Sequence, residues 1–182
     1  MDVCFYNTKI GRIGLVAGIN RCSKIHINDS VMEEFYRSNP DKYYYADEPI
    51  VEVAFWEIDM HFDFGHEISV NFFHARGSKF QHQVWDAISQ IPYGETRSYN
   101  EIAEQIGCPE ELRKVMKICH KNPLPIVVPC HRVIGYDGDL TDYVYGIEVK
   151  KTLLKFEQDL MKTVKYKSHQ KEVLQWKSQQ HL

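Results

Sequence analysis

Several features that would place a protein in a special class are missing from this sequence of 182 residues. No apolar run approaches the roughly 20 residues of a membrane-spanning helix, and the N-terminus lacks the basic and apolar segments of a signal peptide. The five cysteines are odd in number and scattered, which excludes a disulfide framework and suits reduced thiols. A net charge of -3 gives no bulk attraction to nucleic acid or membranes. We therefore expect a cytoplasmic protein, or a nuclear one in a eukaryote, with no membrane partner.

The first part of the chain, residues 1–76, has the pattern of a small α/β domain. Two alternating apolar stretches favour a hairpin that turns near Ile10-Gly11. The other elements are predicted from alternation, from apolar periodicity and from Pro49 at a helix start. The expected strands are 3–8, 12–18, 23–27 and 66–73, and the expected helices are 30–38 and 49–62.

The second part, residues 77–162, is mainly helical after a short linker. Ser98 and Glu101 form a capping box for a helix at 99–106, which Gly107 ends. Another helix is expected at 109–122, so the two helices and their glycine turn have the spacing of a helix-turn-helix. A last amphipathic helix is expected at 146–161. Residues 163–182 are a basic extension, since 161–182 carry five Lys against one Glu.

The predicted helix at 109–122 separates apolar from basic residues. Its apolar stripe comprises Leu112, Val115, Met116 and Cys119. Its opposite side carries Arg113, Lys114, Lys117 and Lys121, which we call the basic ridge. A ridge of this kind binds phosphates in a helix-turn-helix context, whereas charge alone is equally typical of a solvated helix face. Both interpretations remain open at this point.

The stretch "LPIVVPCHRV" places a thiol, an imidazole and a guanidinium side by side after a strand-like apolar run at 124–128. A free cysteine is mostly protonated at neutral pH, and a neighbouring base raises its reactive fraction. Glu157 falls on the apolar face of the last helix, where a carboxylate needs a partner. Cys130, His131 and Glu157 therefore suit a nucleophile, a base and the group that orients the base. A bend at Pro129-Cys130, or a water relay, is required, because adjacent residues of a strand point in opposite directions. The alternative is a structural buried cysteine beside a surface histidine.

The residues around this cysteine resemble a known family. "NPLPIVVPCHRVIG", followed by "YGIEVKKTLLKFE" and preceded by "FQHQVWDAISQIPYGETRSYNEIAEQIG", is similar to the O6-alkylguanine-DNA alkyltransferases over residues 66–160. The resemblance implies an α+β protein with a ribonuclease H-like N-terminal domain and a winged-helix-like C-terminal domain that carries the active cysteine. It also implies a monomer whose partner is double-stranded DNA containing O6-alkylguanine.

The roles of individual residues follow from this resemblance alone. Cys130 would accept the alkyl group, His131 would act as its base through a water, and Glu157 would orient His131. Asn122 would hinge the active-site strand to the recognition helix. Tyr99 would crowd the phosphate and protonate the departing guanine, and Arg113 would fill the gap left by the flipped base. The substrate pocket would comprise Tyr143, Tyr145, Val133 and Pro125, and the DNA contacts would be Arg113, Lys114, Lys117, Lys121 and Tyr99. No dissociable cofactor is expected, because the damaged base is itself the alkyl donor.

The sequence departs from the family pattern in two places. Bulky or charged residues stand on the recognition helix where small ones are usual, and of these Glu111 should repel phosphate. Tyr145 stands at the first glycine of a usual Gly-Gly pair, and Asp142 precedes Tyr143. Tyr145 at the pocket mouth would either stack on the base or narrow the pocket, and we expect O6-methylguanine to react better than bulkier lesions.

The sequence also contains a candidate metal site and allows two other functions. Cys4, Cys22, His26 and His74 are conceivable zinc ligands, but without a CxxC pair we expect no metal. The first rival function is a non-enzymatic sensor of alkylated DNA with the same fold, although such proteins replace the cysteine that this chain keeps. The second rival is a cysteine hydrolase that uses Cys130 and His131.

Overall fold

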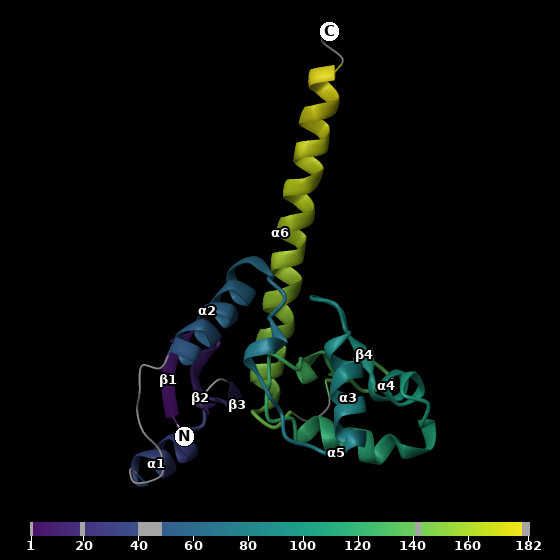
Figure 1. Cartoon of the computed structure of the whole chain (residues 1–182). Helices are drawn as coiled ribbons and strands as arrows, with labels where there is room; N and C mark the ends of the chain where they lie inside the picture. Colours follow the sequence, from purple (N-terminus) through teal and green to yellow (C-terminus); the bar gives the residue numbers. More distant parts are fainter. Residues whose placement is uncertain (1, 19–20, 40–48, 141–142, 180–182) are drawn as a thin grey trace.

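The computed structural model describes residues 2–18, 21–39, 49–140 and 143–179. Asp142, singled out above, lies outside the described residues. A small antiparallel sheet with two helices forms the N-terminal part, and a helical part follows (Figure 1). The predicted α+β class is therefore confirmed.

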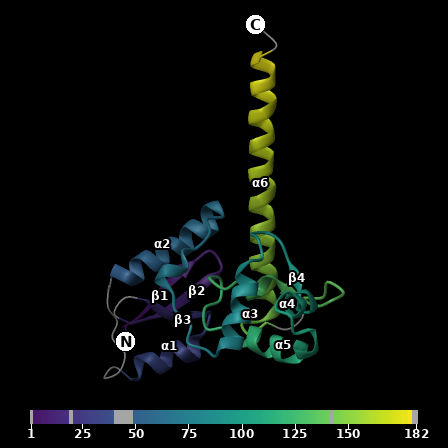
Figure 2. The same ribbon diagram turned by 45° about the vertical axis from the view of Figure 1, so that its right-hand side comes forward.

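The N-terminal sheet consists of β1 (Asp2–Thr8), β2 (Gly11–Ala17) and β3 (Cys22–Ile27), in the order β1-β2-β3. Gly11 closes the predicted hairpin turn with a φ of 113°, a conformation that glycine adopts without steric cost. Helices α1 (Ser30–Arg37) and α2 (Pro49–Phe64) follow, as predicted. Buried apolar residues of β2 and β3 pack against α2, which lies along the sheet (Figure 2).

The strand predicted at 66–73 is wrong. This segment contains a short 3-10 helix, η1 (Val70–Phe72), and only an isolated bridge between Cys22 and Phe73. Side chains of α2 bind its backbone instead of a neighbouring strand: the Ser69 amide donates to Glu57 Oε2 at 2.9 Å, and His61 Nδ1 donates to the His66 carbonyl at 2.8 Å. Alternation of apolar residues cannot reveal such side-chain partners.

The helical part begins with α3 (Lys79–Ser89), followed by β4 (Arg97–Ser98) and α4 (Tyr99–Gln105). The predicted capping box of Ser98 and Glu101 is present, and Gly107 has a φ of 73° at the turn. The next predicted helix starts with one 3-10 turn, η2 (Pro109–Glu111), and continues as α5 (Leu112–His120). The helix-turn-helix is thus formed by α4 and α5.

The apolar run at 124–128 does not form the expected strand. Pro125 and Val128 make an isolated bridge, and Ile126 has a φ of 76°. Asn122 satisfies the backbone of this buried loop, since its Nδ2 donates to the Val128 carbonyl at 2.7 Å and its Oδ1 accepts from the Leu124 amide at 3.0 Å. A side chain therefore replaces the strand partner that the sequence pattern suggested.

The loop leads into η3 (Cys130–Arg132) and β5 (Val133–Ile134), which pairs in parallel with β4. The last helix, α6 (Ile147–Gln179), continues past the boundary predicted at 162/163 and projects from the body of the molecule (Figure 1). Residues before and after position 76 contribute to one hydrophobic core. Among the described residues, no helix combines the length and apolar character needed to cross a bilayer.

Candidate active site

Cys130 is buried at the start of η3, with 3 % of its surface exposed. The turn of η3 supplies the bend that the sequence required, because it prevents the side chains of Cys130 and His131 from alternating as in a strand. Asn122 Nδ2 donates to Cys130 Sγ at 3.1 Å. The active-site loop and the sulfur are therefore held by the same amide side chain.

His131 and Glu157 form a buried pair behind the cysteine. His131 Nε2 lies 2.7 Å from Glu157 Oε1, and the two residues are 0 % and 2 % exposed. The carboxylate accepts, so Nε2 carries the proton and Nδ1 of the neutral imidazole offers a lone pair. This Nδ1 has no hydrogen-bond partner among the protein groups that the structure describes. Burial lowers the pKa of His131 against the opposing effect of Glu157, which favours the neutral base.

Arg132 also binds the carboxylate, a contact that the sequence analysis did not predict. Its Nε lies 3.1 and 3.0 Å from the two oxygens of Glu157, its Nη2 lies 2.9 Å from Oε1, and its Nη1 donates to the Ile91 carbonyl at 2.7 Å. Burial alone would raise the pKa of Glu157, but hydrogen bonds and charge from His131 and Arg132 lower it to about 2. A buried carboxylate requires a cation. The arginine next to His131 is the sequence signal from which this contact could have been predicted.

Several polar groups around Cys130 favour its thiolate. The Cys119 side chain, and after it those of Asn122 and Tyr143, lower the pKa of Cys130 against the opposing effect of burial. Lys150, fully buried on α6, adds a positive charge, and its Nζ donates to the Val133 carbonyl at 2.7 Å. Neither Cys119 nor Lys150 was predicted at the site. Together they favour the thiolate form of this buried sulfur.

The space beside the sulfur is small. A cavity of about 10 Å³ is bordered by Tyr99, Cys119, His120, Cys130, Tyr143 and Val144. The predicted residues Tyr99 and Tyr143 line it. Pro125 and Val133 are buried but do not border it, and the Tyr145 hydroxyl donates to the Ile25 carbonyl at 2.9 Å. Tyr145 therefore contacts the N-terminal sheet and does not project into this cavity.

The basic ridge lies on the exposed side of α5. Arg113, Lys114, Lys117 and Lys121 are exposed, whereas Val115, Ile118 and Cys119 are buried. The ammonium of Lys114 lies 4.3 Å from the centre of the Phe80 ring and 3.5 Å from Glu111 Oε1. Glu111 therefore offsets part of the charge of the ridge.

Of the four conceivable zinc ligands, His26 has two polar partners of its own. His26 Nε2 lies 3.0 Å from the Tyr36 hydroxyl, and its Nδ1 lies 3.3 Å from Asp29 Oδ2. Burial raises the pKa of Cys22 to about 12, which disfavours the thiolate that zinc requires. Among the described residues, no group of three or more Cys, His, Asp or Glu side chains has the arrangement of a metal site.

Comparison with known proteins places this geometry in context. The family described as 6-O-methylguanine DNA methyltransferase, DNA binding domain, matches residues 79–159. Two curated relatives carry the name methylated-DNA–protein-cysteine methyltransferase. The one from Mycolicibacterium paratuberculosis is 59% identical over 83 residues, 46% of this chain and 50% of its own. The one from Methanosarcina acetivorans is 53% identical over 81 residues, 44% of this chain and 52% of its own. The matched region thus spans about half the length of these relatives.

Solved structures extend the similarity to most of the chain. The crystal structure of Mycobacterium tuberculosis OGT in complex with DNA superposes with a TM-score of 0.75 and 32% identity, over 88% of this chain and 94% of that one. The O6-methylguanine-DNA methyltransferase of Pyrococcus kodakaraensis superposes with a TM-score of 0.58 and 25% identity, over 85% and 98% of the two chains. On this evidence the chain belongs to the O6-methylguanine-DNA methyltransferase family.

Proposed function

We propose that the protein repairs O6-alkylguanine in double-stranded DNA by moving the alkyl group irreversibly onto Cys130. The observation that carries this proposal is the buried pair of His131 and Glu157, 2.7 Å apart, behind a cysteine whose surroundings favour the thiolate. The relatives named as methyltransferases support the same chemistry. The five free cysteines suit a reducing compartment.

The proposed reaction is a single displacement. The proton of the Cys130 thiol passes through a water to His131 Nδ1, and the sulfur attacks the alkyl carbon. The new bond is S–C, the broken bond is C–O6, and the electron pair leaves on guanine. Tyr99 protonates the departing guanine and regains a proton from His131 through water, so that over the whole reaction the thiol proton replaces the alkyl group. A thioether does not release its alkyl group, so each protein molecule reacts once.

The DNA must present an extrahelical base, because a thiol cannot reach O6 inside a duplex. We infer that α5 enters the groove with Arg113 replacing the flipped base, and that Lys114, Lys117 and Lys121 bind phosphates. Asn122, at the end of this helix, links the groove-binding element to the sulfur. Glu111 weakens this interaction through its charge.

The test is mass analysis of the protein after incubation with a duplex that contains O6-methylguanine. The proposal expects one methyl group on the peptide that spans Cys130, and none in Cys130→Ala. Binding without a change in mass would instead indicate a damage sensor. Repeated turnover of an acyl substrate would indicate the hydrolase.

A further inference from the structure

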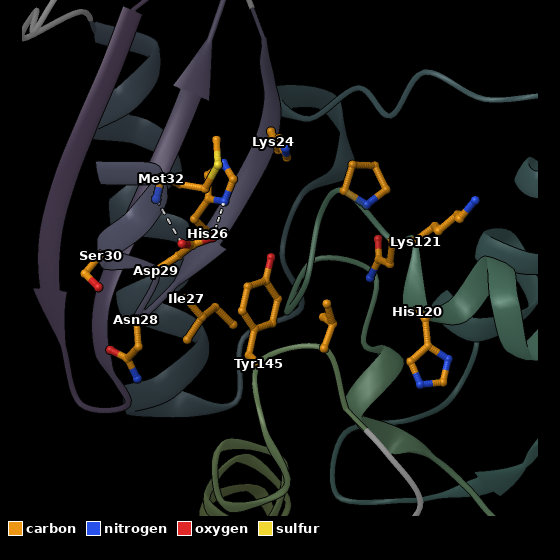
Figure 3. Close-up of a pocket in the computed structure, with 13 residues that line it drawn as sticks. Lys24, His26, Ile27, Asn28, Asp29, Ser30, Met32, His120, Lys121 and Tyr145 are labelled. Carbon is orange, nitrogen blue, oxygen red and sulfur yellow. Dashed lines mark hydrogen bonds and ion pairs between the residues drawn. The ribbon is translucent and has the colours of Figure 1, made fainter. Parts of the chain in front are cut away.

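Two cavities of very different size share a wall in this protein. The one beside Cys130 has about 10 Å³. The other has about 770 Å³ and lies between β3, the start of α1 and the segment 120–123 (Figure 3). Both are bordered by His120 and Val144. We call the larger one the interdomain cavity.

The smaller cavity has the space of about one water molecule, so a guanine base enters only if a wall moves. Four of its wall residues lie on helices: Tyr99 begins α4, Cys119 and His120 lie on α5, and Cys130 begins η3. Tyr143 and Val144 instead lie in the connection between β5 and α6, and Gly146 follows them with a φ of 91°. Segment 143–146 is therefore the wall that helices and strands restrain least.

One residue of the N-terminal sheet holds this segment. The Tyr145 hydroxyl donates to the Ile25 carbonyl at 2.9 Å, and the Ile25 amide donates to the Pro123 carbonyl at 2.8 Å. Figure 3 shows the Tyr145 ring directed from segment 143–146 toward the sheet, at the edge of the interdomain cavity. The Tyr143 and Tyr145 rings are in contact, with centres 5.8 Å apart. The bond to Ile25 thus positions the wall that contains Tyr143.

We propose that Tyr145 is a specificity-determining residue: its hydrogen bond to Ile25 restrains segment 143–146, so that Cys130 accepts small alkyl groups and discriminates against large ones. The inference rests on the proposed function and names the structural cause of a substrate preference within it. The interdomain cavity gives the segment space to move when the bond breaks. A methyl group needs a small displacement, whereas a benzyl group needs a larger one that this hydrogen bond opposes.

The test uses Tyr145→Phe, which removes the hydroxyl and keeps the ring. Single-turnover rates are measured with two duplexes of one sequence, one containing O6-methylguanine and the other O6-benzylguanine. We expect the benzyl-to-methyl rate ratio to rise roughly fivefold, in line with the loss of one net hydrogen bond. Tyr136→Phe, at a tyrosine that is 85 % exposed, is the matched control and leaves the ratio unchanged. A change of less than about twofold in Tyr145→Phe overturns the proposal.

A second measurement does not depend on alkyl transfer. The intact protein is treated with a maleimide in the absence of DNA, and modification of the Cys130 peptide is followed by mass. Faster modification in Tyr145→Phe than in the unsubstituted protein and in Tyr136→Phe supports the restraint, and equal rates contradict it. Failure of the unsubstituted protein to accept methyl would refute the proposed function, while the maleimide rates would still test the role of Tyr145.

Discussion

The guanidinium of Arg132 makes three contacts of 2.9 to 3.1 Å with the carboxylate of Glu157, and both groups are almost fully buried. The Gly94 amide also donates to this carboxylate at 2.9 Å. Arg132 and Gly94 thus hold Glu157 in place independently of its hydrogen bond to His131. The orientation of the proposed base, His131, therefore depends on Arg132, which acts through Glu157.

Replacing Arg132 should cost the protein much of its stability. Arg132→Ala leaves the Glu157 charge buried without its main cation, which typically costs about 3 to 5 kcal/mol. Urea denaturation measures the change in the free energy of unfolding. Lys151→Ala, which breaks the exposed pair with Glu148, is the control and should change it by less than about 0.5 kcal/mol. Equal effects of the two substitutions would show that the buried pair is not important for stability.

Replacing Glu157 by glutamine should slow the reaction more than it impairs DNA binding. Glu157→Gln keeps the shape but loses the charge that fixes and supports His131, so single-turnover alkyl transfer should fall roughly 100-fold or more. Affinity for the damaged duplex, measured on the Cys130→Ala background, should stay within about threefold. A transfer rate close to that of the unsubstituted protein would exclude the proposed role of Glu157.

His61 should make the protein less stable in mild acid. Burial lowers the pKa of His61 to about 4, with Arg132 and His131 opposing its charge and Glu157 favouring it. The unfolded chain binds a proton below about pH 6.5, whereas the folded protein does so only near pH 4, so stability falls as the pH falls through this window. One such group removes roughly 2 kcal/mol between pH 7.5 and pH 5. His61→Asn should reduce this loss in urea denaturation, and His74→Asn, at an exposed histidine, should not.

The basic ridge should determine how DNA affinity responds to salt. Lys117→Ala removes one phosphate contact and should reduce the slope of log affinity against log salt by about 0.9. Glu111→Gln removes a repulsive charge and should increase affinity. Fluorescence anisotropy at several salt concentrations measures both, with Lys9→Ala in the N-terminal turn as the control. A solvated ridge without DNA contact would give the same slope for all variants.

The sequence predicted those parts of the structure that depend on local patterns. The hairpin followed from alternation and Gly11, and the start of α4 followed from Ser98 and Glu101, because these signals lie within a few residues of one another. The pairing of His131 with Glu157 was also predictable, since a carboxylate on an apolar helix face needs a partner.

The errors share one physical origin. Residues 66–73 and 124–128 look like strands, but Glu57, His61 and Asn122 bind or support their backbone from elsewhere in the chain. The contact of Tyr145 likewise depends on tertiary structure, since its partner Ile25 is 120 positions away. No local pattern encodes such pairs.

The central claim is that one buried thiol accepts one alkyl group from DNA. The most direct measurement is the intact mass of the protein after incubation with a several-fold excess of duplex containing O6-methylguanine. We expect a single methyl group per chain, located at Cys130, and no repair after the protein is consumed. A protein that remains unmodified while binding this duplex, or that repairs several duplexes per chain, would contradict the account.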